Sequence, residues 1–491
     1  MNYMNNYEKL NEYLSEIAET GYIIDVLKWE MDTTAPKKSL DFLIKVKTKM
    51  EMKNFNLATS SKYLKLLNNL INSQEFAKLS QEEQIIIKDM KEDYEASKRI
   101  PTIFYEEYCT LLSNSEKAWV EAKEQNDYNI FKPYLKDVID STKKFYTYMY
   151  PDKDLYNAML DTYEHNLDKN KIDKLFSDLK AEIIPLVKNL KPAKIIPETK
   201  KYSNQELIDV AKYLLDYIGF DNSRGTLGIF AHGYTCKFNN DDVRITFSNN
   251  KTIFDHVCTV IHEGGHGIFE QNIGPNLHKL SISEINKYAL HESQSRFFEN
   301  ILGRNYNFWT PIYKDIKDML NLSLTQEEFV SYLNNAHPSL IRTGADELTY
   351  CLHIIMRYEI ERDLFDNKIT VDDLPRIWNE KTKEYLGLEI TNDRDGILQD
   401  VHWSDGSFGY FPSYLIGSIF DGMLINSVEK ELGNIDTLLS TGRIKEITKY
   451  LNNNIHKYGG AYQIEEVAKR VCNSELDIKP LVNYFKDKYG K

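Results

Sequence analysis

The chain has 491 residues, of which 42% are hydrophobic, and its formal net charge is −13. This length and composition allow a large buried core, while an acidic surface repels phosphate backbones and argues against nucleic acid as a partner. The polar N-terminus shows no signal peptide, and no apolar run approaches the roughly 20 residues that span a bilayer, so we expect a cytoplasmic protein that binds no membrane.

The five cysteines are scattered along the chain and form no Cys-x-x-Cys pair. This spacing argues against a disulfide framework and against a metal site built from thiolates. We expect the cysteines to be small buried hydrophobic residues in a protein of a reducing compartment.

Apolar residues at three- and four-residue spacing predict helices over most of the chain, and almost throughout residues 1–195. The Thr-Thr-Ala-Pro sequence within residues 29–39 must interrupt this helical region. A second break, at residues 190–201, contains two prolines and predicts two lobes, 1–195 and 196–491, within a single domain of residues 1–491. Residues 243–247 are β-branched and aromatic and give the clearest predicted strand.

The sequence His-Glu-Gly-Gly-His at residues 262–266 predicts a metal site in the second lobe. On a helix, His262 and His266 lie one turn apart on the same face, where two imidazoles can bind one Zn²⁺. Glu263 can then reach a metal-bound water without binding the metal, as in the H-E-x-x-H motif. Gly264 and Gly265 each cost roughly 1 kcal/mol inside a helix, so we expect another segment to approach this helix closely.

A third metal ligand is expected from the sequence Leu-His-Glu-Ser-Gln-Ser-Arg at residues 290–296. It is either His291 or Glu292, because adjacent helical residues point about 100° apart and only one of them can face the metal. Helical spacing does not choose between the two. Three protein ligands and one open position are typical of catalytic zinc, and histidine and carboxylate ligands also accept cobalt.

Several separated motifs give the chain a resemblance to the carboxypeptidase Taq family of metallocarboxypeptidases. The motifs are His-Glu-Gly-Gly-His at 262–266, His-Glu-Ser-Gln-Ser-Arg at 291–296, Asp-Val-Arg-Ile-Thr at 242–246, Ile-Arg-Thr-Gly-Ala-Asp at 341–346 and Gly-Ile-Leu-Gln-Asp-Val-His-Trp at 396–403. Residues 29–36 also resemble an N-terminal family segment, with Glu30 and Ala35 as departures. The sequence His-Gly-Tyr at 232–234 replaces the family's usual His-Pro-Phe, which concerns the local backbone rather than the metal chemistry.

The resemblance implies a mainly helical, zincin-like fold with a small β-sheet beside a deep active-site cleft. It also implies a homodimer that releases single residues from peptides with a free C-terminus. Among the two alternatives for the third ligand, it implies Glu292. His291 is then left to support the ligands or to contact substrate.

For catalysis, Glu263 is the candidate general base, which takes a proton from water and passes it to the leaving amine. His402, Tyr410 and Tyr414 are candidate donors to the oxyanion that forms. The alternative for these three residues is a packed histidine and two core aromatics.

For substrate binding, arginine suits a terminal carboxylate because its planar guanidinium binds carboxylates bidentately. Arg342 and Arg244 lie inside the family motifs and are the leading candidates, with His232 and His291 beside them. The alternative for Arg244 is an ion pair with Asp242, two residues away on the same strand face. The alternative for Arg342 is pairing with the neighbouring residues 346 and 347.

Two other functions are open at this point. One is a helical binding or scaffold protein whose histidine pair is incidental, although the presence of Glu263 disfavours it. The other is a zinc endopeptidase or dipeptidase of related architecture. A peptide with a blocked C-terminus separates an endopeptidase from a carboxypeptidase.

Overall fold

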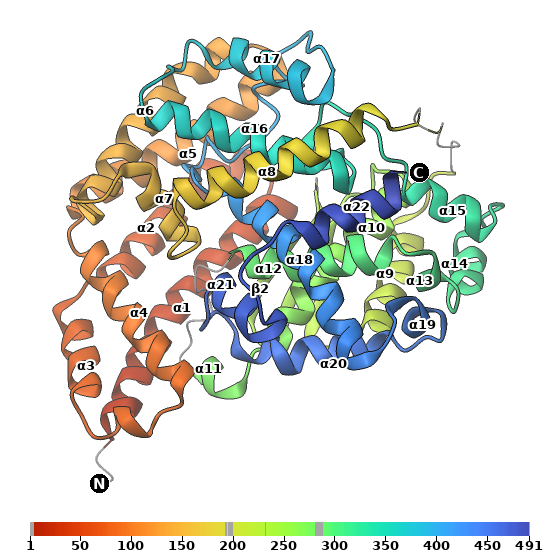
Figure 1. The fold of residues 1–491 in the computed structure, drawn as a ribbon. Helices are drawn as coiled ribbons and strands as arrows, with labels where there is room; N and C mark the ends of the chain where they lie inside the picture. The colour runs from red at the N-terminus through yellow and green to blue at the C-terminus, as the bar shows by residue number, and fades with distance from the viewer. Residues whose placement is uncertain (1–3, 192–193, 195–199, 231, 280–287, 491) are drawn as a thin grey trace.

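Long helices account for most of the molecule, and three short strands form a small sheet (Figure 1). This computed structural model describes residues 4–191, 194, 200–230, 232–279 and 288–490. It confirms the predicted mainly helical fold with a small β-sheet. None of the described helices combines the length and apolarity that a membrane span needs, and all five cysteines are free thiols.

The helices predicted for residues 1–195 are confirmed in the described part of that region. They are α1 (Asn6–Thr33), α2 (Leu40–Ala58), α3 (Ser61–Ile71), α4 (Gln81–Ser97), α5 (Thr102–Gln125), α6 (Tyr128–Met149), α7 (Leu155–Tyr163) and α8 (Lys169–Lys188), with 3₁₀ turns η1 (Lys37–Ser39) and η2 (Phe76–Lys78). The first predicted break lies between α1 and η1, where Pro36 has no backbone N–H to continue a helix.

The second predicted break falls between α8 and α9 (Asn204–Ile218), and part of this connection, residues 192, 193 and 195–199, lies outside the described residues. α8 packs against α16 (Glu347–Phe365) and α22 (Lys479–Tyr489), two helices from the other side of the break. The buried apolar side chains form one cluster that runs from Leu10 to Phe485. The chain thus shares one core, and its division into two lobes stays a prediction.

The sheet contains β1 (Gly225–Ile229), β2 (Tyr234–Asn239) and β3 (Asp242–Phe247), in the order β1-β3-β2. β1 runs parallel to β3, whereas β2 is antiparallel to it. The predicted strand at 243–247 is therefore confirmed as the central strand β3. Val243, Ile245 and Phe247 alternate along β3 and are fully buried, and both β3 and β2 pack against α10 (Ile253–Gln271).

Besides α10, α16 and α22, the second half of the chain contains further helices. They are α11 (Pro275–Lys279), α12 (Tyr288–Arg296), α13 (Tyr306–Trp309), α14 (Tyr313–Leu320), α15 (Gln326–Leu333), α17 (Leu374–Leu386), α18 (Phe411–Leu432), α19 (Ile435–Ser440), α20 (Ile444–Asn454) and α21 (Ile464–Val467), with π-helices η4 (Phe297–Gly303) and η7 (Ala468–Cys472) and 3₁₀ turns η3 (Asn222–Arg224), η5 (Arg342–Gly344) and η6 (His456–Tyr458).

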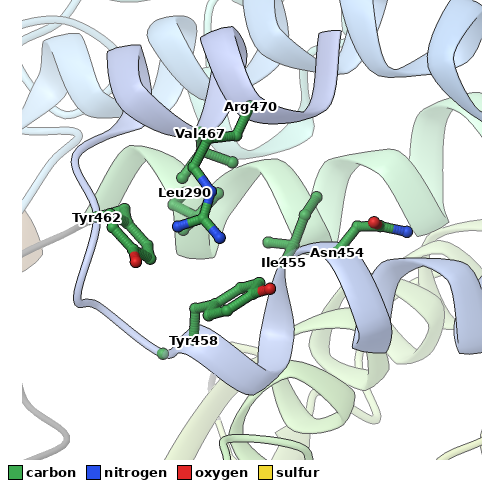
Figure 2. A pocket seen from close by; sticks show the side chains of 8 residues that line it. Leu290, Asn454, Ile455, Tyr458, Tyr462, Val467 and Arg470 are labelled. Carbon is green, nitrogen blue, oxygen red and sulfur yellow. The ribbon is translucent and has the colours of Figure 1, made fainter. Parts of the chain in front are cut away.

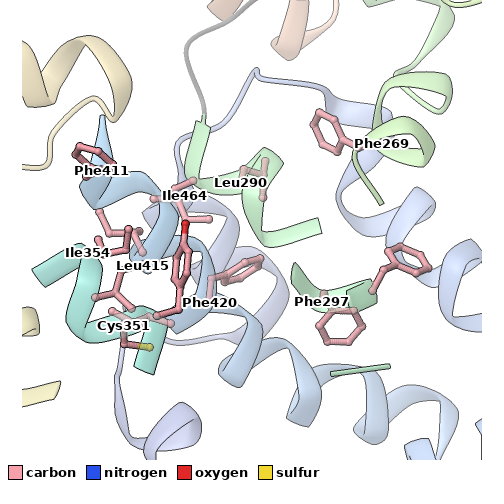
Figure 3. Close-up of a cluster of buried hydrophobic side chains, with 14 of the residues drawn as sticks. Phe269, Leu290, Phe297, Cys351, Ile354, Phe411, Leu415, Phe420 and Ile464 are labelled. Carbon is pink, nitrogen blue, oxygen red and sulfur yellow. The ribbon is translucent and has the colours of Figure 1, made fainter. Parts of the chain in front are cut away.

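Apolar side chains from α12, α16 and α18 pack together in part of the hydrophobic core (Figure 3). Leu290 of α12, Ile354 of α16 and Leu415 of α18 are at most 1% exposed. α18 packs against both α12 and α16. This packing fixes α12 on one side, while α10 contacts it as well.

Two glycines allow α12 to lie unusually close to its neighbours. A Cβ atom added to Gly265 of α10 would lie 2.7 Å from the backbone of both Gln294 and Ser295. A Cβ atom added to Gly417 of α18 would lie 2.7 Å from the carbonyl oxygen of Ala289. The close approach expected from the glycines of the His-Glu-Gly-Gly-His motif is therefore present, and α12 is the segment that makes it.

We predict that Gly265→Ala destabilises the protein by about 1–3 kcal/mol, the usual cost of overpacking, because both colliding groups are backbone and cannot rotate away. Urea denaturation measures this change. Gly344→Ala is the matched control, since a Cβ atom at Gly344 meets nothing within 4 Å. Equal stabilities for the two variants would contradict the close contact between α10 and α12.

Candidate metal centre

His262, His266 and Glu292 converge in one group, with their ligand atoms all within 4.8 Å of one another. The histidines come from α10 and the glutamate from α12. His266 Nε2 lies 3.4 Å from Glu292 Oε2, and His262 Nε2 lies 4.0 Å from Glu292 Oε1. Two imidazoles and one carboxylate form a donor set that suits a catalytic transition-metal ion. Glu292 is thus the third member of the group, and His291 is not.

The protonation states of His266 and Glu292 fit metal binding. Burial, with the charge of His291 as the next cause, lowers the pKa of His266 to about 3, so the imidazole is neutral. Burial alone would raise the pKa of the Glu292 carboxyl, but Arg296 and the two histidines hold it well below its ordinary value. Neutral histidine and ionised glutamate are the forms that bind metals.

Charged partners, one half-buried and one buried, hold two of these ligands in place. His262 Nδ1 lies 2.9 Å from Glu299 Oε2, which directs Nε2 toward Glu292. Glu299 belongs to the π-helix η4 and also pairs with Arg304 at 2.8 Å. Arg296 Nε lies 2.6 Å from Glu292 Oε1. Sequence reasoning missed Glu299, although it follows Glu292 by seven residues, which is two helical turns.

Glu263 is buried beside the metal-binding group but does not belong to it. Burial raises the pKa of its carboxyl to about 6. The Thr235 hydroxyl lies 2.7 Å from Glu263 Oε2. A carboxyl whose pKa lies near neutral pH, next to a metal site, has the properties of a general acid–base group.

His291 lies against the metal-binding group without joining it. Its ring stacks on that of His266, with centroids 4.4 Å apart. Its Nε2 is 3.0 Å from Glu270 Oε1, and Glu270 pairs in turn with Lys237 at 2.9 Å. Glu270 therefore orients His291, and His291 in turn packs against a metal ligand.

Arg342 is buried, and its ion-pair partner is Asp400 rather than Asp346 or Glu347, which follow it closely in the sequence. Arg342 Nη2 and Nε lie 2.8 and 2.9 Å from Asp400 Oδ1. The predicted local alternative is wrong because both neighbours have other partners. Asp346 accepts hydrogen bonds from the first backbone N–H groups of α16, and Glu347 pairs with Lys488.

A second buried arginine shares the same aspartate. Arg357 Nη2 lies 2.6 Å from Asp400 Oδ2, and Arg357 is fully buried. Arg342 also donates from Nη1 to the Tyr350 hydroxyl at 2.9 Å. Two buried cations against one anion leave an excess positive charge, which favours the binding of a further anionic group.

His402, Tyr410 and Tyr414, the three candidate oxyanion donors, lie together. His402 Nε2 is 3.4 Å from the Tyr414 hydroxyl, and the rings of Tyr410 and Tyr414 are 4.9 Å apart. Burial lowers the pKa of His402 to about 3, with Arg342 as the next cause. The Arg342 guanidinium lies 5.3 Å from the Tyr414 ring centre, and that of Arg296 lies 5.9 Å from it. Tyr414 thus connects the arginine cluster to the metal-binding group.

Arg244 forms the ion pair with Asp242 that was the alternative to its expected role in substrate binding, through contacts of 2.9 Å from Nε and 2.7 Å from Nη2. Its guanidinium also lies over the rings of Phe238 and Trp29. His232 is exposed, and its charge contributes to the lowered pKa of His402.

A separate small pocket lies next to the start of α12 (Figure 2). The Arg470 guanidinium rests there against the rings of Tyr458 and Tyr462, at 4.3 and 3.8 Å from their centres. The volume of about 10 Å³ holds about one water molecule, so this pocket has no room for a peptide.

Comparison with known proteins identifies the group to which this fold and this metal site belong. The model of the carboxypeptidase Taq (M32) metallopeptidase family matches residues 9–489. The chain belongs to this family. It is therefore a metallocarboxypeptidase that acts on peptides, and the group of His262, His266 and Glu292 is its candidate metal site.

M32 relatives match the chain over nearly its full length. Carboxypeptidase 1 of Bacillus subtilis is 36% identical, with 99% of each chain covered. Thermostable carboxypeptidase 1 of Pyrococcus furiosus is 30% identical, with 96% of this chain and 95% of the relative covered. The structure of Trypanosoma cruzi metallocarboxypeptidase 1 matches this chain with a TM-score of 0.91 at 27% identity, with 99% of both chains covered.

Proposed function

We propose that this M32 metallocarboxypeptidase uses zinc, releases single residues from peptide C-termini, and employs Glu263 as its general base. The observation that supports this most strongly is the convergence of His262, His266 and Glu292 beside the buried carboxyl of Glu263. Two histidines and one glutamate are typical ligands of catalytic zinc, and cobalt is compatible with the same donors.

The chain's own residues support a proton-transfer role for Glu263. A zinc ion held by the three ligands would acidify water and polarise the scissile carbonyl. Glu263 takes a proton from the attacking water and later donates it to the leaving amine. Its pKa of about 6 suits both transfers, because a group with a pKa near the working pH can accept and return a proton.

The oxyanion and the substrate carboxylate need donors of their own. We assign Tyr410, Tyr414 and His402 to the oxyanion, since their cluster lies between the arginines and the metal-binding group. We assign the terminal carboxylate to Arg342, because the arginine cluster carries an excess positive charge that a carboxylate neutralises.

The remaining predictions concern the edge of the site and the protein as a whole. Arg244, His232 and His291 are proposed to contact the rest of the peptide, although the ion pair with Asp242 already engages Arg244. The deep cleft, the homodimer and the cytoplasmic location likewise remain proposals based on the resemblance to the family.

The experiment that tests the proposed function compares peptides with a free and an amidated C-terminus. Amidation removes the carboxylate charge, so we expect cleavage by the zinc-loaded protein to fall at least about 100-fold, the loss of a charge-assisted bidentate contact. Arg342→Lys keeps the charge but loses the planar fork, and we expect it to raise KM for the free peptide about tenfold. Mass spectrometry of the products gives both results. Equal cleavage of the two peptides would indicate an endopeptidase.

We also predict that Glu263→Gln retains bound zinc and loses at least about three orders of magnitude in kcat, because glutamine has nearly the same size but accepts no proton. Elemental analysis measures the zinc, and steady-state kinetics measures kcat. Turnover within tenfold of the wild type would place the general base elsewhere.

A further inference from the structure

One hydroxyl group contacts Glu263 at two points. The Oγ1 atom of Thr235, on β2, lies 2.7 Å from Glu263 Oε2 and 3.0 Å from the carbonyl oxygen of the same residue. β2 packs against α10, and Thr235 is held in register opposite Ile245 of the central strand, which is fully buried. The hydroxyl is therefore presented to Glu263 from a rigid element rather than from a loop.

Gly233, two residues earlier, lies against the same glutamate. A Cβ atom at this position would be 2.4 Å from Thr259 Cγ2 and 3.1 Å from Glu263 Oε1. Only glycine allows the backbone to come this close. Any other side chain at position 233 would collide with the Thr259 side chain and crowd the Glu263 carboxylate.

We propose that residues 233–235 form a clamp that positions the Glu263 carboxylate, with the Thr235 hydroxyl as its essential group. The proposal rests on the proposed role of Glu263 as general base. Thr235 is a positioning residue in this account, because it acts through Glu263 and does not contact the reacting atoms. Gly233 limits the space on the Oε1 side, and Thr235 holds Oε2.

The Thr235 hydroxyl has two acceptors on the same residue within hydrogen-bonding distance, the Glu263 Oε2 atom and the Glu263 carbonyl oxygen. A hydroxyl has one hydrogen to donate, so it bonds one of them at a time. Its bond to Oε2 fixes the position of the carboxylate relative to β2, and the nearby carbonyl oxygen belongs to the helix that carries the carboxylate.

The first test compares Thr235→Val, which removes the hydroxyl at nearly constant volume, with Thr235→Ser, which keeps it. We expect Thr235→Val to lower kcat at least about tenfold, since small misplacements of catalytic groups are costly, while KM and zinc content stay within about twofold. Thr235→Ser should retain at least about half of the wild-type kcat. If Thr235→Val does not fold, Thr235→Ala removes the same hydroxyl and takes its place.

Thr142→Val is the matched control. Thr142 is fully buried and bonds the Tyr108 hydroxyl at 2.9 Å, in a contact between α5 and α6. This variant loses one buried threonine hydroxyl without a change near Glu263, so its kcat should match the wild type. An unaltered kcat in Thr235→Val, or a Thr235→Ser variant as impaired as Thr235→Val, would overturn the proposal.

A double-mutant cycle separates this proposal from the proposed function. Aspartate at position 263 is one methylene too short to reach Thr235, so Thr235→Val should have no further effect on kcat in a Glu263→Asp background. If the fold-decrease in kcat of the double variant equals the product of the decreases of the two single variants, Thr235 does not act through Glu263. Failure of the proposed base is seen independently, as near-normal turnover of Glu263→Gln.

Discussion

The closeness of α12 to α10 is the constraint on which the metal centre depends. The two histidines come from one helix and the glutamate from the other, so the ligand group exists only where the helix backbones nearly touch. Gly265 on one side of α12 and Gly417 on the other permit that approach. The helix-breaking tendency of Gly265, roughly 1 kcal/mol, is thus offset by packing that brings Glu292 to His262 and His266.

Burial and neighbouring charges give two glutamates of the site different pKa values. Glu292 and Glu263 are both buried glutamates, yet their pKa values move in opposite directions. Arg296 and the histidines keep Glu292 ionised, whereas burial dominates at Glu263 and raises its pKa to about 6. These different environments suit Glu292 to its candidate role as a metal ligand and Glu263 to its proposed role in proton transfer.

Local sequence patterns predicted the helices, the central strand and the histidine pair, because helical and strand periodicities depend on residues a few positions apart. These local patterns do not predict contacts between residues that are far apart in the sequence. Helical spacing left His291 and Glu292 equivalent, and only the resemblance and then the packing of α12 chose Glu292. For Arg342, the alternative to substrate binding was a pairing with residues 346 and 347, but its ion-pair partner Asp400 lies 58 positions away. The Thr235 contact likewise requires a strand and a helix to meet.

We propose that α10 and α12 together form a zinc site in which Glu263 does not bind the metal. A crystal structure of the zinc-loaded protein, with anomalous scattering recorded at the zinc edge, locates the ion and its ligands. We expect one peak per chain, bound by His262 and His266 at about 2.0–2.1 Å and by the Glu292 carboxylate at about 2.0–2.2 Å. A zinc ion bound by Glu263 or His291 in place of Glu292 would contradict it.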